Sequence, residues 1–309
     1  MSFFPGKDPE FGDAESCNDV AQLIIPRTSD IGGFEVRRAL PTIKRRLVGP
    51  FIFFDRMGPA RFGGHGEALD VKPHPHIGLS TVTYLTSGEI GHRDTLGNHT
   101  VIRPGDVNLM TAGRGIVHSE RTPDDLRLRP HALSGVQTWL ALPERDEEID
   151  PSFGHTEKNA LPTISETGVS GRLVLGHFCG MKADVKTHTD TLLADIALRP
   201  GARLSFPAEH EERAIYILEG QLGVAGDVFD AEQLLVLAPN DPITIEGAGE
   251  HGCRLMLFGG EALEKPRHIW WNFVSSSKER IEQAKEDWRQ GRFGLVPGDE
   301  KEFVPLPER

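Results

Sequence analysis

The stretch NHTVIRPGDVNLMTAGRG, residues 98–115, decides how the chain folds, because strand-forming and turn-forming residues alternate along it. The letters NHTVI and VNLMT carry the β-branched and apolar residues of short strands, whereas PGD and AGRG carry the residues of tight turns. The preceding stretch STVTYLTSG, residues 80–88, has the same character and ends at a Ser-Gly turn. We therefore expect a succession of short strands joined by turns.

The same pattern returns in the second half of the chain. Residues 84–88 (YLTSG) have a counterpart in residues 216–220 (YILEG), and Pro104-Gly105-Asp106 has one in Pro239-Asn240-Asp241. A repeat of this size indicates a duplicated domain rather than a solenoid. We predict an all-β fold of two antiparallel β-sandwich or jelly-roll barrels in tandem. The expected boundaries are an N-terminal domain at 1–145, a linker at 146–170 and a C-terminal domain at 171–309.

One helix is predicted, at about residues 277–290, near the end of the second domain. The stretch SSSKERIEQAKEDWRQG, residues 275–291, offers Ser276 as the N-cap, Glu279 three residues later and Gly291 beyond the last turn. We expect this helix to pack on a barrel and to carry no chemistry. In the second domain, Glu212 and Arg213 are expected to be solvated charges.

Composition limits the partners and the location. The formal net charge is −12 over 309 residues and there is no basic run, which argues against direct binding of nucleic acid. The sequence offers no apolar run of membrane-spanning length and no secretory signal, so we expect no membrane partner. The three cysteines, Cys17, Cys179 and Cys253, are widely spaced and form no CxxC pair, which is typical of idle thiols in a reducing cytoplasm.

Two pairs of polar residues stand out against the strands. His74 and His76 flank a proline, and residues two apart on a strand point to the same face. His118 and Glu120 repeat this spacing after a glycine turn. If the pairs converge in one barrel, three imidazoles and a carboxylate form a ligand set for one divalent transition metal. Iron, nickel, copper, manganese and zinc stay open, whereas calcium is disfavoured; isolated surface histidines are the alternative.

Several stretches together resemble the pirin family, a branch of the cupin superfamily. They are LVGPFIFFDRMGPA (47–60), KPHPHIGLSTVTYLTSGEIGHRDTLGN (72–98), IRPGDVNLMTAGRGIVHSE (102–120), VQTWLALP (136–143) and GEALEKPRHIWWNFV (260–274). The resemblance implies a bicupin with one metal, usually iron, in the N-terminal barrel. It places the ligands at His74, His76, His118 and Glu120. The second barrel has Phe206 and Ala208 where the first has its histidine pair, so we expect it to hold no metal and to rigidify the first.

The resemblance implies two functions. Some pirins resemble quercetin 2,3-dioxygenases, which open a flavonol ring with dioxygen and release carbon monoxide. For this chain that implies a flavonol-like aromatic substrate and dioxygen, with Glu120 as the catalytic base as well as a ligand, and Phe53 and Met57 at the pocket rim. Other pirins are iron-dependent redox-sensing regulators that bind a protein partner such as a transcription factor or a metabolic enzyme. Substrate-dependent oxygen uptake distinguishes the two.

One further histidine, His92, has two interpretations. It lies in the stretch GHRD beside Asp94. It is either a turn residue bonded to Asp94 or to the backbone, or a residue that orients a metal ligand. The sequence leaves this choice open, together with the native metal, the natural substrate and the oligomeric state.

Overall fold

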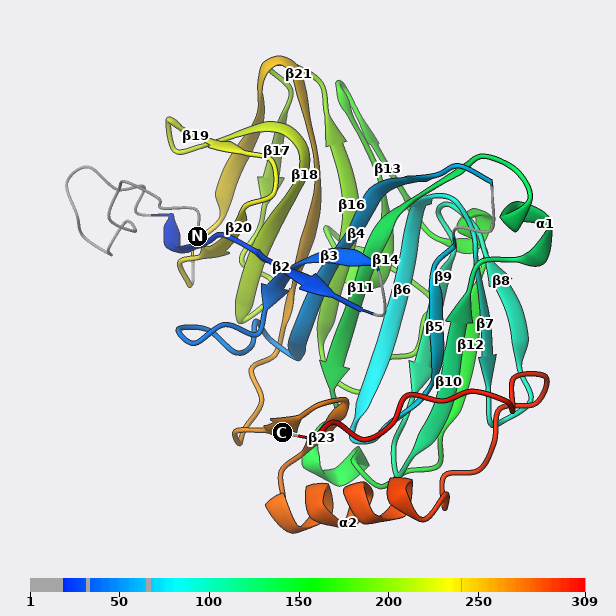
Figure 1. Ribbon diagram of the computed structural model, residues 1–309. Coiled ribbons are helices and arrows are strands. Elements are labelled where there is room, and N and C mark those ends of the chain that lie inside the picture. Colours follow the sequence, from blue (N-terminus) through cyan, green and yellow to red (C-terminus); the bar gives the residue numbers. More distant parts are fainter. Residues whose placement is uncertain (1–18, 32–33, 65–67, 240, 309) are drawn as a thin grey trace. The chain divides into compact units, whose positions relative to one another are not determined.

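The computed structural model of the protein describes residues 19–31, 34–64, 68–239 and 241–308. The chain divides into two compact units, each assembled from segments that are distant in sequence (Figure 1). The first unit comprises Thr28–Pro41, Phe51–Ala160 and Leu263–Arg309. The second unit comprises Met1–Arg27, Thr42–Pro50 and Leu161–Ala262.

The first unit contains a seven-stranded and a four-stranded antiparallel sheet. In spatial order, the larger sheet runs β12 (Ser152–Thr156), β9 (Val107–Thr111), β6 (Leu79–Ser87), β11 (His131–Ala141), β4 (Phe51–Phe62), β3 (Glu35–Leu40) and β2 (Arg27–Asp30). The smaller sheet runs β5 (Asp70–His76), β10 (Ile116–Arg121), β7 (Ile90–Asp94) and β8 (His99–Ile102). The predicted Pro-Gly-Asp turn joins β8 to β9, and the amide of Asp106 donates to the carbonyl of Arg103 (3.0 Å).

Helical and short elements complete the first unit. They are α1 (Asp124–Arg127), the 3₁₀ turns Glu144–Asp146 and Lys158–Ala160, the hairpin β22 (His268–Trp270) and β23 (Phe273–Ser275), and α2 (Lys278–Arg289). The predicted C-terminal helix is therefore present as α2. Its buried residues Ile281 and Ala284 pack against Ile77 and Phe273, so this helix belongs to the first unit (Figure 1).

The cap of α2 lies one residue later than predicted. The hydroxyl of Ser277 accepts a hydrogen bond from the amide of Arg280 (3.2 Å). The Ser276 hydroxyl instead donates to the buried carboxylate of Glu147 (3.0 Å), which also pairs with Arg267 (2.8 Å). Ser276, which the spacing suggests as the cap, is therefore bonded to this buried ion pair.

The second unit is one ten-stranded antiparallel sheet that curls around its own core. The path runs β1 (Val20–Ile24), β20 (Leu234–Leu237), β18 (Glu212–Val224), β21 (Ile243–Gly260), β16 (Thr191–Leu198), β14 (Val169–Phe178) and β13 (Thr163–Glu166), with β15 (Met181–Lys182), β17 (Arg203–Phe206) and β19 (Asp227–Asp230) paired off it. The long strands β18 and β21 each change partners along their length, and β18 has register shifts between Ile217 and Glu219 and between Gly220 and Gln221.

The observed units differ from the linear division expected from the sequence. The strand β1 pairs with β20, so the beginning of the described chain belongs to the second unit. Residues 146–170, expected to be a linker, contain β12, which pairs with β9, and β13, which pairs with β14. Backbone pairing between remote segments decides to which unit a strand belongs. The local composition of the sequence does not predict this pairing.

Arg213 is buried, which contradicts the expectation of a solvated charge. Only 1% of its surface is exposed, and its guanidinium donates to the carbonyls of Phe206, Pro207, Ala238 and Asp241. Glu212 is half-buried and accepts from Arg45 (2.7 Å) and from the amide of Gly49 (2.6 Å). Both charges therefore fasten loops of the second unit.

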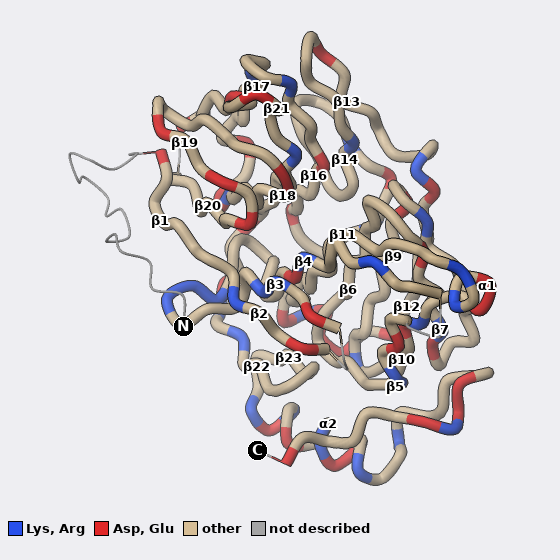
Figure 2. Tube along the Cα trace, turned by 45° about the horizontal axis from the view of Figure 1, so that its top comes forward, with Lys and Arg blue, Asp and Glu red and all other residues tan. Residues whose placement is uncertain are grey.

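The charged residues of both signs are spread along the described chain. Figure 2 shows blue and red segments interleaved along the described chain. Cys179 is exposed and Cys253 is buried, and both are free thiols, while Cys17 lies outside the described residues. Within the described residues, none of the helices has the length and apolar character that crossing a bilayer requires.

Candidate metal centre

The two histidine-bearing strands are neighbours in the four-stranded sheet. β5 and β10 run antiparallel, and His118 lies directly opposite His74, while Ile116 lies opposite His76. The register shifts between His118 and Glu120, so that Glu120 pairs with Val71. This bulge changes the direction of the chain just beyond the third histidine. The predicted convergence of His74, His76 and His118 is therefore present.

The three imidazoles offer ring nitrogens that all lie within 4.8 Å of one another. The Nε2 atoms of His76 and His118 are only 3.1 Å apart. All three rings are buried, and burial lowers the pKa of His74 and lowers the pKa of His76 and of His118 well below the ordinary histidine value. The cluster is therefore a set of neutral imidazoles, which is the form that binds metals.

Backbone carbonyls fix the tautomers of the first pair. The Nδ1–H of His74 donates to the carbonyl of Lys72 (2.8 Å), and the Nδ1–H of His76 donates to the carbonyl of Asn272 (3.2 Å). A carbonyl oxygen only accepts, so each Nδ1 must carry the hydrogen of the neutral ring. The Nε2 atom of each ring is left with a free lone pair.

A relay through His92 fixes the third tautomer. The buried carboxylate of Asp94 accepts from His92 Nε2 (3.0 Å), and His92 Nδ1 lies 3.5 Å from Nδ1 of His118. Burial by itself would raise the pKa of Asp94, but hydrogen bonds from His92 and Asn98 outweigh it and lower this pKa, so the carboxylate is ionised. His92 therefore accepts from His118 Nδ1–H, and the Nε2 lone pair of His118 is free.

His92 lies in the strand β7 and not in a turn, but it shares features of both interpretations that the sequence left open. It is bonded to Asp94, and it also orients a histidine of the cluster. Its neighbour Phe153, on β12, stacks on the ring at 4.4 Å between centroids. The arrangement thus depends on a strand that the sequence had placed in a linker.

The facing lone pairs of the cluster suit a cation. Two Nε2 lone pairs facing each other at 3.1 Å repel, and a third lone pair from His74 points into the same space. A metal cation accepts all three lone pairs, and neutral imidazole suits divalent first-row metals. The residues present therefore fit one transition metal.

Glu120 lies beside the histidines but outside the group of atoms that converge within 4.8 Å. Each carboxylate oxygen is 2.8 Å from Nε2 of Gln137, and the hydroxyl of Thr83 donates to Oε1 (3.2 Å). The carboxylate is buried and oriented by neutral donors. Gln137 and Thr83 were missed in the sequence, although each is a polar residue within a predicted strand.

Aromatic rings form a wall beside His76. Trp139 lies 5.1 Å from the His76 ring, and Phe53 stacks on Trp139 at 4.0 Å between centroids. The indole Nε1 of Trp139 is buried and has no hydrogen-bond partner among the described residues. Met57, expected at the rim, instead packs in a core cluster with Val36 and Leu85.

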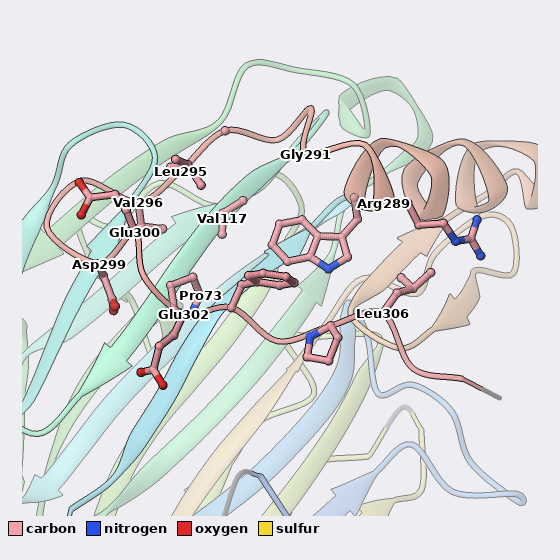
Figure 3. Close-up of a pocket in the computed structure, with 14 residues that line it drawn as sticks. Pro73, Val117, Arg289, Gly291, Leu295, Val296, Asp299, Glu300, Glu302 and Leu306 are labelled. Atoms are coloured by element: carbon pink, nitrogen blue, oxygen red, sulfur yellow. The ribbon is translucent and has the colours of Figure 1, made fainter.

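A separate pocket of about 260 Å³ lies on the other side of β5 and β10. Its lining includes Pro73 and Val117, each of which directly precedes a histidine of the cluster in sequence, together with Trp288 and Phe303 (Figure 3). Successive side chains on a strand face opposite sides, so this lining faces away from the imidazoles. The C-terminal segment closes the pocket, and the amide of Val304 donates to the carbonyl of Pro73 (2.8 Å).

Fold and site together define a class, namely a two-unit antiparallel β-protein with a candidate three-histidine metal centre in one unit. Comparison with known proteins makes this specific. The Pirin family model matches residues 33–140, and the model of the pirin C-terminal cupin domain matches residues 193–294. The chain belongs to the pirin family and has its two-domain cupin fold.

Relatives and a solved structure support this assignment. A pirin-like protein of Caulobacter vibrioides is 48% identical, over 91% of this chain and 97% of its own length. A protein of Pseudomonas aeruginosa provisionally named a quercetin 2,3-dioxygenase is 40% identical, over 93% of this chain and 90% of its own length. The crystal structure of quercetin 2,3-dioxygenase from Acinetobacter baumannii matches with a TM-score of 0.85 and 34% identity, covering 93% of this chain and 96% of that chain.

Proposed function

We propose that this chain is a metal-dependent dioxygenase of the quercetin 2,3-dioxygenase type, with iron as the first metal to test. The observation that carries the proposal is the convergence of three buried, neutral imidazoles whose free nitrogens face one another. The similarity to proteins named quercetin 2,3-dioxygenases supports the choice of a flavonol and dioxygen as substrates.

His74, His76 and His118 would hold the metal, and we propose Glu120 as the fourth ligand when the metal is bound. A divalent transition metal supplies a Lewis acid that lowers the pKa of the flavonol hydroxyl and brings the substrate and dioxygen together. Imidazole and carboxylate ligands accept iron, nickel, copper, manganese or zinc, so the ligand set does not select among them.

Glu120 is the proposed general base. Its carboxylate lies two residues from His118 on the same strand, and the Gln137 amide and the Thr83 hydroxyl fix its orientation. A carboxylate in this position can accept the proton of the flavonol hydroxyl at one oxygen, while Gln137 stabilises the other. Both oxygens are sheltered from solvent, which keeps competing water away from the proton transfer.

The Phe53–Trp139 pair is the proposed contact for the flat substrate. Stacked rings beside a ligand histidine offer an apolar face to an aromatic molecule. The unpartnered Nε1–H of Trp139 is a hydrogen-bond donor that a substrate oxygen would satisfy after a small ring movement.

Oxygen consumption tests this proposal. The iron-loaded protein should consume dioxygen when quercetin is added and release carbon monoxide. His76→Ala should remove the metal from this centre and abolish uptake, and Glu120→Gln should slow uptake strongly. The matched control is His99→Ala, because His99 is an exposed histidine of the same unit outside the cluster. Iron-loaded protein that binds quercetin but takes up no oxygen would refute the enzymatic proposal.

The pocket behind β5 and β10 favours a second candidate function, a redox-sensing regulator that binds a protein partner. A partner seated there would contact residues adjacent to His74 and His118 (Figure 3). Such a switch requires two metal states that differ at this surface. Hydrogen exchange of the Val304 amide should then differ between ferrous and ferric protein. Equal exchange, with oxygen uptake present, would exclude this candidate.

A further inference from the structure

A second group of potential metal ligands lies in the second unit and shares no residue with the candidate metal centre. It consists of His177 at the end of β14, Asp190 just before β16, and His210 in the loop before β18. Their donor atoms lie within 4.8 Å of one another. Nδ1 of His177 is 3.2 Å from Oδ1 of Asp190, and Nδ1 of His210 is 2.8 Å from Oδ2.

The tautomer of His210 is fixed by the backbone. Its Nε2–H donates to the carbonyl of His177 (3.0 Å), and only 1% of the side chain is exposed. A neutral ring with its hydrogen on Nε2 has a lone pair on Nδ1. That lone pair faces a carboxylate oxygen, so the contact requires either a second proton on the ring or a cation shared by the two atoms.

His177 offers a second nitrogen to a cation shared with His210 and Asp190. Its Nδ1 faces the other oxygen of the same carboxylate, and its ring lies 4.3 Å from that of His210. In the metal-free state a neutral His177 can donate its Nδ1–H to the carboxylate, so only His210 needs a second proton there. One metal ion accepts both nitrogens and the carboxylate together. Ligands bound at about 2.0–2.1 Å to one ion lie about 3 Å apart, and each nitrogen lies at such a distance from the carboxylate oxygen that it faces.

The surroundings suit a metal that enters from solvent. The side chains of His177 and Asp190 are 43% and 35% exposed, whereas His210 is buried behind them. Solvent can therefore reach one side of the group and complete the coordination shell. Two imidazoles with one carboxylate suit zinc, nickel or copper rather than calcium or magnesium.

We propose that His177, Asp190 and His210 form a second metal site, which takes a divalent transition ion such as Zn²⁺. This site is separate from the proposed dioxygenase centre. It joins β14 to the loops that precede β16 and β18, so a bound ion fastens three segments of the second unit. Because the unfolded chain does not hold these residues together, the ion stabilises the folded state.

Zinc titration of the full-length, metal-stripped protein tests the proposal. Zinc content after desalting, with affinity measured by chelator competition, should give two ions per chain in the wild type. His177→Gln and Asp190→Asn should each leave one ion and weaken binding at this site by more than about 100-fold, since even indirect partners of a ligand account for 10–100-fold. His76→Ala should also leave one ion, held by the second site.

Two controls isolate the cluster. His251→Ala removes an exposed histidine of the same unit, and Cys179→Ser removes an exposed thiol two positions from His177; neither should change the zinc content. Zinc should raise the melting temperature of His76→Ala but should not raise that of a variant that combines His76→Ala with His177→Gln. Circular dichroism of the metal-free variants checks that they are folded.

One result would overturn the second metal site. If folded His177→Gln protein binds as much zinc as the wild type with the same affinities, the cluster is an ion pair with a doubly protonated His210 and the proposal is wrong. This outcome would leave the dioxygenase proposal untouched, because His76→Ala and oxygen uptake test that centre separately.

Discussion

The two units carry histidine clusters that differ in what faces the nitrogens. In the first unit, His74 and His76 donate to neutral carbonyls, and His118 is joined to Asp94 only through His92. In the second unit, the carboxylate of Asp190 contacts both imidazoles directly. The first cluster is therefore organised around free lone pairs, whereas the second can be neutralised either by protons or by a metal.

The two clusters also lie at different places in their units. The position of the ligand pair in the first barrel corresponds to Phe206 and Ala208 in the second. Phe206 is fully buried in the apolar core of the second unit. The same position therefore carries buried imidazoles in the first unit and an apolar core residue in the second. The second cluster lies instead at loops and strand ends.

The largest expected effect is that of His76→Ala. It removes a lone pair that faces His118 at 3.1 Å, so the first unit should lose its metal, with affinity falling by more than about 100-fold. His177→Gln should leave that affinity unchanged. Metal analysis with chelator competition measures both. An equal loss of metal affinity of the first unit in the two variants would show that the two clusters are coupled and do not act separately.

The variant Glu120→Gln distinguishes the proposed role of Glu120 as a general base from its proposed role as a metal ligand. If the proton transfer depends on Glu120, kcat should fall by about 10²–10⁴-fold, because general base catalysis contributes that much. Stopped-flow oxygen uptake and metal content should be measured on the same sample. A variant with normal turnover would remove Glu120 from the mechanism, whereas one that also loses its metal would make ligation its main role.

Asp94→Asn tests the relay to His118. Without the carboxylate, His92 is free to change tautomer, and Nδ1–H of His118 loses its defined acceptor. We expect metal affinity in the first unit to fall by about 10–100-fold, as is found for such indirect partners. Asp106→Asn is the control, since Asp106 is a buried carboxylate of the same unit placed at the turn before β9. Unchanged affinity in Asp94→Asn would reduce the relay to a packing contact.

The metal-free protein should show a pH dependence of its stability. Burial lowers the pKa of His76 and of His118 below the ordinary value of 6.5, so below that pH the unfolded chain binds protons that the folded chain does not. Stability should be complete above pH 6.5 and should decrease on acidification, by about 1.4 kcal/mol per pH unit for each histidine. Urea unfolding of wild type and His76→Asn measures this. An equal slope in the variant would contradict the assignment.

Spacing predicted the centre of the site better than its surroundings. The two-residue period of a strand places His74 on the same face as His76, and the strand after the glycine turn places His118 opposite His74. The acceptor of His76 is the carbonyl of Asn272, which is 196 positions away in sequence. Backbone atoms have no signature in the sequence, so only the folded chain reveals this contact.

The fold shows the same limit. Alternation and turns predicted the strands of β6, β9 and β10, because those signals are local. They could not predict that β1 pairs with β20, or that α2 joins the first unit, because such pairings depend on which distant surfaces remain uncovered. Arg213 was misjudged for this reason, since its four carbonyl acceptors come from loops that meet only in the folded unit.

Iron K-edge X-ray absorption of the anaerobically iron-loaded protein tests the central claim most directly. The measurement is best made in the His177→Gln background, where the first unit provides the imidazole site. We predict imidazole scattering from three histidines. Adding His76→Ala should remove both this scattering and the bound iron. An unchanged spectrum and an unchanged iron content after that substitution would contradict the proposed metal centre.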